Sequence, residues 1–380
     1  MKIILGASGH GKSHELYKRV VDAACNEANR NFYIIVPEQN SLQVEKDILA
    51  LHPNHGMFNI NVLTFGRMTF RIFDELGIEL NENIDELGKT LIVRKVVGQV
   101  ADRLKIIKAS KKPGLIGEVK SLISELKQYG ISSDDLERII DGNSFGDRLS
   151  QKLKDVEVIY AAFEEYIAGR FTTTEDRPEA MLSVMDRSHY FDDAVVYFDN
   201  FTGFTPVQYR IIEKVMEKAK EMMFFVNLPD DEAYNQMGGE EELFHMSKEM
   251  IARLGSLCDE HHTDFRVERI ETDFDSYRYK NSSELAFLEK NVFRYNGRTY
   301  KEETKDIEIR QLDNPLEEVQ CLAADIIDNV QNKGMMFRDM GVILGDVSPR
   351  NPPVPKEIRM FFPPILKIPF HFSRLSWQVS

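Results

Sequence analysis

The segment from residue 6 to residue 13 constrains the fold more than any other part of the sequence. It satisfies the pattern G-x-x-x-x-G-K-[ST], which occurs between a strand and a helix. A short apolar run at residues 2–5 precedes it, and residues 14–24 carry apolar side chains at helical spacing. The sequence therefore predicts a strand, a glycine-rich loop and a helix. The loop consists of Gly6, Ala7, Ser8, Gly9, His10, Gly11, Lys12 and Ser13.

Each fixed position of this loop has a mechanical reason. Glycines allow the backbone to turn several N–H groups inward onto a phosphate, and the N-terminus of the following helix adds a positive potential. Lys12 can bridge the β- and γ-phosphates, and the Ser13 hydroxyl can ligate the accompanying Mg²⁺. We therefore expect residues 6–13 to bind ATP with Mg²⁺. The alternative is a glycine turn with an exposed lysine.

A second residue belongs with this loop. Phosphate loops work with an acidic residue at the end of a buried strand, which holds Mg²⁺ through water. The apolar run at residues 195–198 ends at Asp199, which we predict to fill this role. The alternative is an aspartate that ends a strand in an ordinary turn.

Strands and helices alternate along much of the chain. Apolar runs resembling strands lie at residues 32–36, 60–63, 194–198 and 222–226, with a helix predicted at residues 41–51. Such alternation is typical of a parallel sheet covered by helices. Helical periodicity dominates in between. We therefore predict one α/β domain, formed by residues 1–70 and 188–300 and split by an all-helical insert at residues 71–187.

The remaining residues predict the start of a second α/β domain at residues 301–346. Strands are expected at residues 307–312 and 340–344, with a helix at residues 316–332 between them. Seven of the 14 prolines follow Val347. Because proline interrupts helices and central strands, we expect residues 347–380 to be irregular.

Composition limits the possible partners and locations. A net charge of -14 argues against an autonomous nucleic-acid binder, since such proteins need a basic surface. The best local basic cluster is also typical of a solvated helical face. No segment reaches the roughly 18 apolar residues of a membrane span, and the N-terminus lacks a signal sequence, so a cytoplasmic location is expected. The cluster contains Arg94, Lys95, Lys105, Lys108, Lys111 and Lys112.

The cysteines predict neither disulfides nor a paired-cysteine metal site. Cys25, Cys258 and Cys321 are far apart and odd in number, so buried free thiols are expected. A metal site of Cys258 with His261 and His262 is the weaker alternative.

Residues 199–208 resemble the Walker B segment of the AddB family, the B subunits of AddAB-type helicase-nucleases. More remotely, they resemble the D-E-x-Q-D-x-x-x-x-Q segment of superfamily 1 helicases, in which Asp199 and Gln208 keep the spacing of the aspartate and the final glutamine. The resemblance extends from Met1 to about Asp346. Other segments similar to this family are residues 36–39, 64–67, 125–130 and 174–176.

This resemblance implies a RecA-like parallel sheet of the superfamily 1 type, with its helical insert and the start of a second RecA-like domain. It implies ATP with Mg²⁺ as cofactor and Gln208 as a possible phosphate sensor. It also implies an AddA-like helicase-nuclease partner that carries the motor, and a heterodimer that acts on DNA ends and single-stranded DNA in recombinational repair. The nuclease domain and iron-sulfur cluster of the family are not expected in this chain.

Two departures from the helicase pattern affect the mechanism. The glutamate that follows the Walker B aspartate in active helicases is Asn200 here, and an amide cannot take a proton from water. The expected G-D-x-x-Q segment is replaced by residues 226–230. We therefore expect nucleotide binding with slow or absent hydrolysis, and no catalytic residue is assigned. A free-standing P-loop kinase and a non-catalytic scaffold stabilised by nucleotide are the alternatives.

Overall fold

A computed structural model describes residues 1–79, 83–107, 113–143, 145–271 and 277–343. The chain forms two compact units, Met1–Gly297 and Arg298–Ser380. None of the helices in these described ranges combines the length and apolarity needed to cross a membrane.

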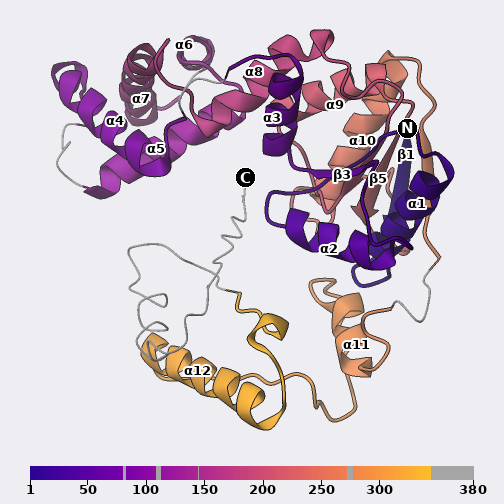
Figure 1. Cartoon of the computed structure of the whole chain (residues 1–380). Coiled ribbons are helices and arrows are strands. Elements are labelled where there is room, and N and C mark those ends of the chain that lie inside the picture. The colour runs from indigo at the N-terminus through magenta and orange to yellow at the C-terminus, as the bar shows by residue number, and fades with distance from the viewer. Residues whose placement is uncertain (80–82, 108–112, 144, 272–276, 344–380) are drawn as a thin grey trace. The chain divides into compact units, whose positions relative to one another are not determined.

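The first unit contains a six-stranded sheet in the order β3-β2-β4-β5-β1-β6 (Figure 1). Every neighbouring pair is parallel, as the alternation of strands and helices predicts. The polar edge strand β6 has no counterpart in the sequence prediction, because its residues lack an apolar run. The strands are β1 (Lys2–Gly6), β2 (Phe32–Ile35), β3 (Ile60–Leu63), β4 (Val195–Asp199), β5 (Glu221–Asn227) and β6 (Arg266–Arg269).

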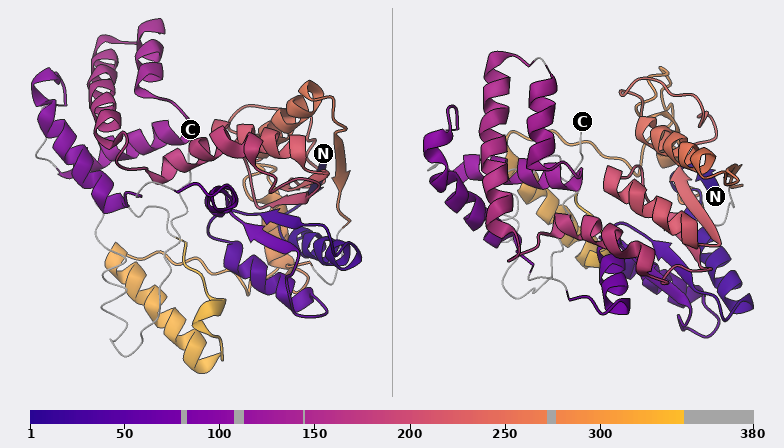
Figure 2. Two further views of the ribbon diagram at one scale, coloured as in Figure 1. Left: turned by 45° about the horizontal axis from the view of Figure 1, so that its top comes forward. Right: turned by 90° about the horizontal axis from the view of Figure 1, so that it is seen from above.

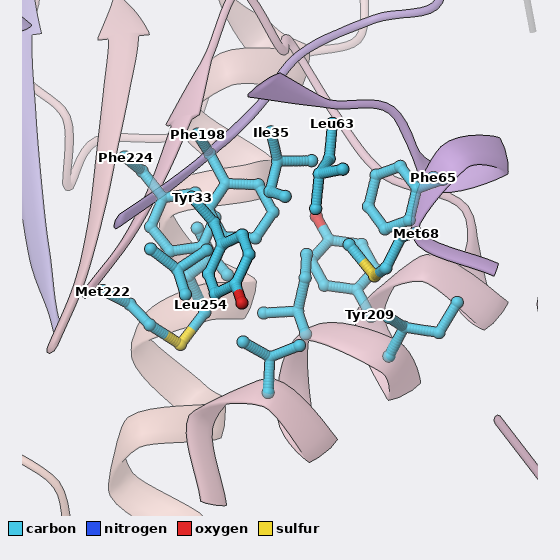
Figure 3. Close-up of a cluster of buried hydrophobic side chains, with 14 of the residues drawn as sticks. Tyr33, Ile35, Leu63, Phe65, Met68, Phe198, Tyr209, Met222, Phe224 and Leu254 are labelled. Carbon is cyan, nitrogen blue, oxygen red and sulfur yellow. The ribbon is translucent and has the colours of Figure 1, made fainter. Parts of the chain in front are cut away.

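Helices cover both faces of the sheet. Successive strand residues point to opposite faces, so Ile4 packs with α1 and α2, whereas Ile3 and Leu5 pack with α3, α8, α9 and α10. On the second face the rings of Phe198 and Phe224 stack with centroids 4.3 Å apart (Figure 3). These helices are α1 (Lys12–Asn26), α2 (Ser41–Leu51), α3 (Phe65–Glu75), α8 (Arg177–Val184), α9 (Pro206–Lys218) and α10 (His245–Glu260).

Most of the helices between β3 and β4 form a group of their own beside the sheet (Figure 2). Their buried side chains make a separate hydrophobic core. The helical character predicted for this stretch is therefore confirmed, while the predicted domain boundaries stay predictions. The α3 and α8 helices at its two ends pack on the sheet. The core helices are α4 (Glu86–Gln99), α5 (Pro113–Gln128), α6 (Ser133–Gly142) and α7 (Asp147–Ile167), with short 3₁₀ turns at Ala101–Arg103, Thr174–Asp176 and Met185–Arg187.

Two buried charged groups hold these helices in place. Lys89 on α4 is 2% exposed, and its Nζ lies 2.6 Å from Glu175 Oε1. The carboxylate of Asp155 on α7 accepts backbone N–H bonds from three consecutive residues, 105–107. Both groups are satisfied by partners far away in sequence, so each ties two segments together.

The second unit contains α12 (Pro315–Asn332) and a 3₁₀ turn at Phe337–Asp339. The predicted helix is confirmed. Residues 307–312 do not form a strand, so that prediction is wrong, and residues 340–343 do not either. A strand needs a neighbour for its backbone hydrogen bonds, and the described part of this unit, residues 298–343, supplies none. Residue 344 and the proline-rich tail lie outside the described residues.

Candidate nucleotide-binding site

The glycine-rich loop connects the carboxyl end of β1 to α1. The helix after β1 covers one face of the sheet, whereas α10 after the neighbouring strand β5 covers the other. In parallel sheets, ligands bind at such a change of face, beyond the carboxyl ends of the strands. The fold therefore places the predicted loop at the position where a ligand site is expected.

Two glycines give the loop its path. Gly9 and Gly11 have φ angles of 77° and 85°, in the left-handed region that favours glycine. Gly11 immediately precedes α1 and offers no side-chain cap. The first backbone N–H groups of α1 therefore remain suited to an external acceptor, and a helix N-terminus favours an anion.

Lys12 folds back across this loop. Its Nζ donates to the carbonyl oxygen of Ala7 at 2.8 Å and to Asn227 Oδ1 at 3.4 Å. Burial lowers the pKa of Lys12 to about 8, and the charge of Asp199 opposes this shift. The ammonium group is thus partly desolvated and bonded to two neutral oxygens. Phosphate oxygens could take the place of these two acceptors.

Ser13 and Asp199 meet although 186 residues separate them. Ser13 Oγ donates to Asp199 Oδ2 at 2.9 Å, and Asn200 Nδ2 donates to the same oxygen at 3.1 Å. Asp199 is 1% exposed, and burial raises the pKa of its carboxyl group. Its other oxygen, Oδ1, is buried without a hydrogen-bond partner in the described part of the chain. Mg²⁺ is a hard cation that prefers oxygen ligands. The Ser13 hydroxyl and the Asp199 carboxylate, one oxygen of which has no hydrogen-bond partner among the described residues, are ligands of this kind.

Lys12, Ser13 and Asn200 line a cavity of about 370 Å³. The buried Asp199 is not part of the lining and reaches the cavity only through its hydrogen bonds with Ser13 and Asn200. Arg278 contributes a second cation, and its backbone N–H donates to Gly9 O at 2.8 Å. Sequence reasoning missed Arg278 because it follows the polar edge strand β6, and it missed Asn227 at the end of β5. The rule that ligands bind at the carboxyl ends of parallel strands could have drawn attention to Asn227. The lining comprises Ser8, Gly9, Gly11, Lys12, Ser13, His14, Asn200, Phe201, Thr202, Phe225, Asn227 and Arg278.

Gln208 lies in the first turn of α9 and does not line this cavity. Its side-chain Oε1 accepts from the Thr205 backbone N–H at 2.9 Å, and its own N–H donates to Thr205 Oγ1, forming a capping box. Its role as a phosphate sensor stays a prediction. Asn200 does line the cavity, with a left-handed φ of 64°, which asparagine tolerates better than most residues.

The remaining candidates do not join this site. Cys258 is buried, as expected, but Cys25 is exposed and Cys321 is half-buried. The expectation of a buried thiol is therefore wrong for Cys25, which faces outward from α1, and is not met in full for Cys321. His261 contacts Glu213 at 2.8 Å. No group of three possible metal ligands occurs among the described residues. Three of the lysines in the basic cluster, at 108, 111 and 112, lie outside those residues.

The fold and site together define an α/β protein with a parallel sheet and a glycine-rich loop that lines a cavity at the carboxyl ends of the strands. The family described as "ADDB, N-terminal" matches residues 3–289. The chain belongs to this family, as the resemblance implied.

Curated relatives agree with this assignment. The chain is 33% identical over 364 residues to the B subunit of the ATP-dependent helicase/deoxyribonuclease of Lachnoclostridium phytofermentans, covering 95% of this chain and 32% of the relative. The corresponding B subunits of Clostridium novyi and Ruminiclostridium cellulolyticum are 30% and 26% identical, over 91% and 90% of this chain and 30% of each relative. The chain thus spans about a third of the length of these relatives.

Proposed function

We propose that this chain binds ATP with Mg²⁺ through residues 6–13 and Asp199. The observation that most directly supports this proposal is the hydrogen bond of 2.9 Å between Ser13 Oγ and the buried Asp199 carboxylate, beside the Lys12 ammonium group. The names of the relatives, which describe ATP-dependent proteins, support the choice of nucleotide.

Each group has a distinct task in this proposal. Backbone N–H groups of the loop and of the first turn of α1 bind the phosphates. Lys12 exchanges its contact with Ala7 O for phosphate oxygens, which are stronger acceptors for an ammonium group. Ser13 and Asp199 would hold Mg²⁺, the serine directly and the aspartate through water. When bound, the ion neutralises phosphate charge.

We further propose that this chain hydrolyses ATP slowly or not at all. Asn200 follows Asp199 where active helicases carry a glutamate, and its amide cannot accept a proton from water. The amide instead donates to Asp199 Oδ2. Asn200 therefore supports the Mg²⁺-binding carboxylate rather than activating water.

In the whole protein, we propose that residues 1–300 form the first, RecA-like motor domain of an AddB-type protein, with its helical insert and a degenerate motor, and that residues 301–346 begin the second such domain. The parallel sheet and the family membership support this role. The partner would be an AddA-like helicase-nuclease subunit, and the heterodimer would resect double-strand DNA ends in the cytoplasm. We place the nuclease activity outside these 380 residues, which span about a third of the named relatives.

Calorimetric titration with Mg-ATP tests the binding site. We expect saturable binding by the wild-type chain and its loss in Lys12→Ala, because each charge-assisted phosphate contact contributes strongly. Lys18→Ala is the matched control, since Lys18 is an exposed lysine on the same helix. Absence of binding by the folded wild-type chain would contradict the proposal.

Steady-state ATPase assays with and without single-stranded DNA test the motor. We expect turnover near background in both conditions. Turnover by the chain alone that rises with DNA would refute the degenerate motor, and a phosphorylated small-molecule product would indicate a kinase instead. Co-purification with a large helicase partner from the source cells would support the heterodimer over a free-standing scaffold.

A further inference from the structure

A second cavity, of about 380 Å³, has walls of a different chemistry. Its lining is mostly aliphatic and aromatic and comes from the segment before α10, from Tyr279 and from α11 (Ser283–Asn291) with the residues after it. Cavities of this size that combine apolar walls with a few polar groups suit small molecules. The apolar wall includes Leu243, Phe244, Tyr279, Leu285, Leu288 and Val292.

The two cavities are neighbours. Ser8 and Asn227 line both of them. Asn227 Oδ1 also accepts from Lys12 Nζ, so the shared wall belongs to the phosphate-binding machinery proposed above. A single ligand can therefore place one end in each cavity.

The segment that contributes Tyr279 to the wall of the second cavity is attached to the glycine-rich loop. The backbone N–H of Arg278 donates to Gly9 O at 2.8 Å, and the rings of His10 and Tyr277 contact edge-on with centroids 4.9 Å apart. The Tyr279 ring lies so close to Gly9 that a Cβ added there would be 2.8 Å from Tyr279 Cε2. Residues 277–279 thus hold the apolar wall at a set distance from the loop.

Charge determines which end of a ligand enters which cavity. The first cavity contains the cations Lys12 and Arg278. The second contains a carboxylate, Glu289, and among the described residues no lysine or arginine lines it. Phosphates are therefore attracted to the first cavity and repelled from the second.

We propose that the second cavity holds the adenine base and ribose of the nucleotide whose phosphates bind residues 6–13. This inference rests on the proposed ATP binding. The apolar wall buries the faces of the base, and the Tyr279 ring within this wall can stack on one of them. Glu289 can accept a hydrogen bond from the exocyclic amine, and Ser8 can bond to the ribose hydroxyls.

Comparison of ATP with inorganic tripolyphosphate, both with Mg²⁺, tests this assignment by calorimetry. The two ligands share the phosphate chain, and only ATP reaches the second cavity. Base–aromatic contacts predict that the wild-type chain binds ATP about tenfold or more tightly than tripolyphosphate. A 2-aminopurine analogue of the nucleotide should lose fluorescence on binding as its base enters the apolar wall.

Substitution at Leu288 tests the second cavity without changing the first, because Leu288 lines only the second. Leu288 is 42% exposed, so Leu288→Trp and Leu288→Ala leave the sheet core intact. We expect both to weaken ATP binding by about fivefold or more and to leave tripolyphosphate within about twofold. Leu42→Trp, at a leucine on α2 that is 62% exposed, is the control and should change neither affinity.

The outcomes distinguish the two proposals. If neither ligand binds, the phosphate site itself is wrong. If tripolyphosphate binds as tightly as ATP, or if both Leu288 variants retain wild-type affinity for ATP, the phosphate site stands and the base-binding cavity is refuted. Preferential loss of ATP affinity in the Leu288 variants supports the assignment.

Discussion

Raising the pH from 7 to 9 should weaken ATP binding by about tenfold, through one lysine. Burial lowers the pKa of Lys12 to about 8 in the nucleotide-free chain. The neutral fraction of Lys12 then rises from about a tenth at pH 7 to about nine tenths at pH 9. A bound triphosphate favours the ammonium form and so raises the pKa again.

The direction in which ATP affinity changes with pH follows from this linkage between binding and protonation. Only the protonated lysine binds the phosphates, so below pH 8 the chain is ready to bind, whereas above it each binding event must take up a proton. The logarithm of the dissociation constant should therefore be nearly flat up to pH 7 and then rise with a slope approaching one. Burial also raises the pKa of Tyr17 beside the site, so that residue stays neutral throughout and adds no slope.

Calorimetry at half-unit intervals of pH, in buffers with different ionisation enthalpies, measures both the affinity and the proton uptake. Circular dichroism at each pH shows that the chain remains folded. Lys12→Met is the matched variant, and any residual affinity it keeps should not depend on pH in this range. A wild-type dissociation constant that changes by less than about twofold between pH 7 and 9 would refute the reasoning.

Three further predictions concern stability, measured by thermal and urea unfolding. Burial raises the pKa of Asp199, so keeping this carboxylate charged at pH 7 lowers the free energy of unfolding. This destabilisation disappears as the pH falls through the raised pKa and the carboxyl group takes up a proton. Asp199→Asn should therefore raise the melting temperature at pH 7, less so at lower pH, while weakening Mg-ATP binding; a lower melting temperature at pH 7 would contradict this. Gly11→Ala should cost about 1 kcal/mol, since φ is 85° there, and no loss would contradict the left-handed loop. Lys89→Met should cost about 3–5 kcal/mol by leaving the buried Glu175 unpaired, and adding Glu175→Gln should recover part of that loss.

Local patterns predicted most elements of the first unit well. Residues 41–51 and 60–63 form the predicted helix and strand with the same bounds, because their apolar spacing and their flanking turns agree. The β6 strand was missed, since an exposed edge strand carries no apolar run. Residues 307–312 show the opposite error. Their alternating pattern suits a strand, but a strand forms only where a neighbour accepts its hydrogen bonds.

The site divides in the same way. Residues 6–13 and Asp199 could be predicted as candidates from the sequence, because the glycine pattern is long and the aspartate ends an apolar run. Arg278 could not, since a lone arginine after a polar segment resembles any surface residue. The second cavity was also beyond reach, because its wall combines residues from three separate segments around Phe244, Tyr279 and Leu288.

The sequence by itself determined the strand, loop and helix at the start of the chain, the kind of side chains in the glycine-rich loop, and the family. These features depend on neighbours within a few residues, and local backbone sterics and hydrophobic periodicity are enough to specify them. Only the tertiary structure decided that Ser13 meets Asp199 and that Arg278 and α11 line cavities together with residues of the loop. Such contacts depend on the order in which strands pair, and that order is set by the packing of the whole sheet between its helices.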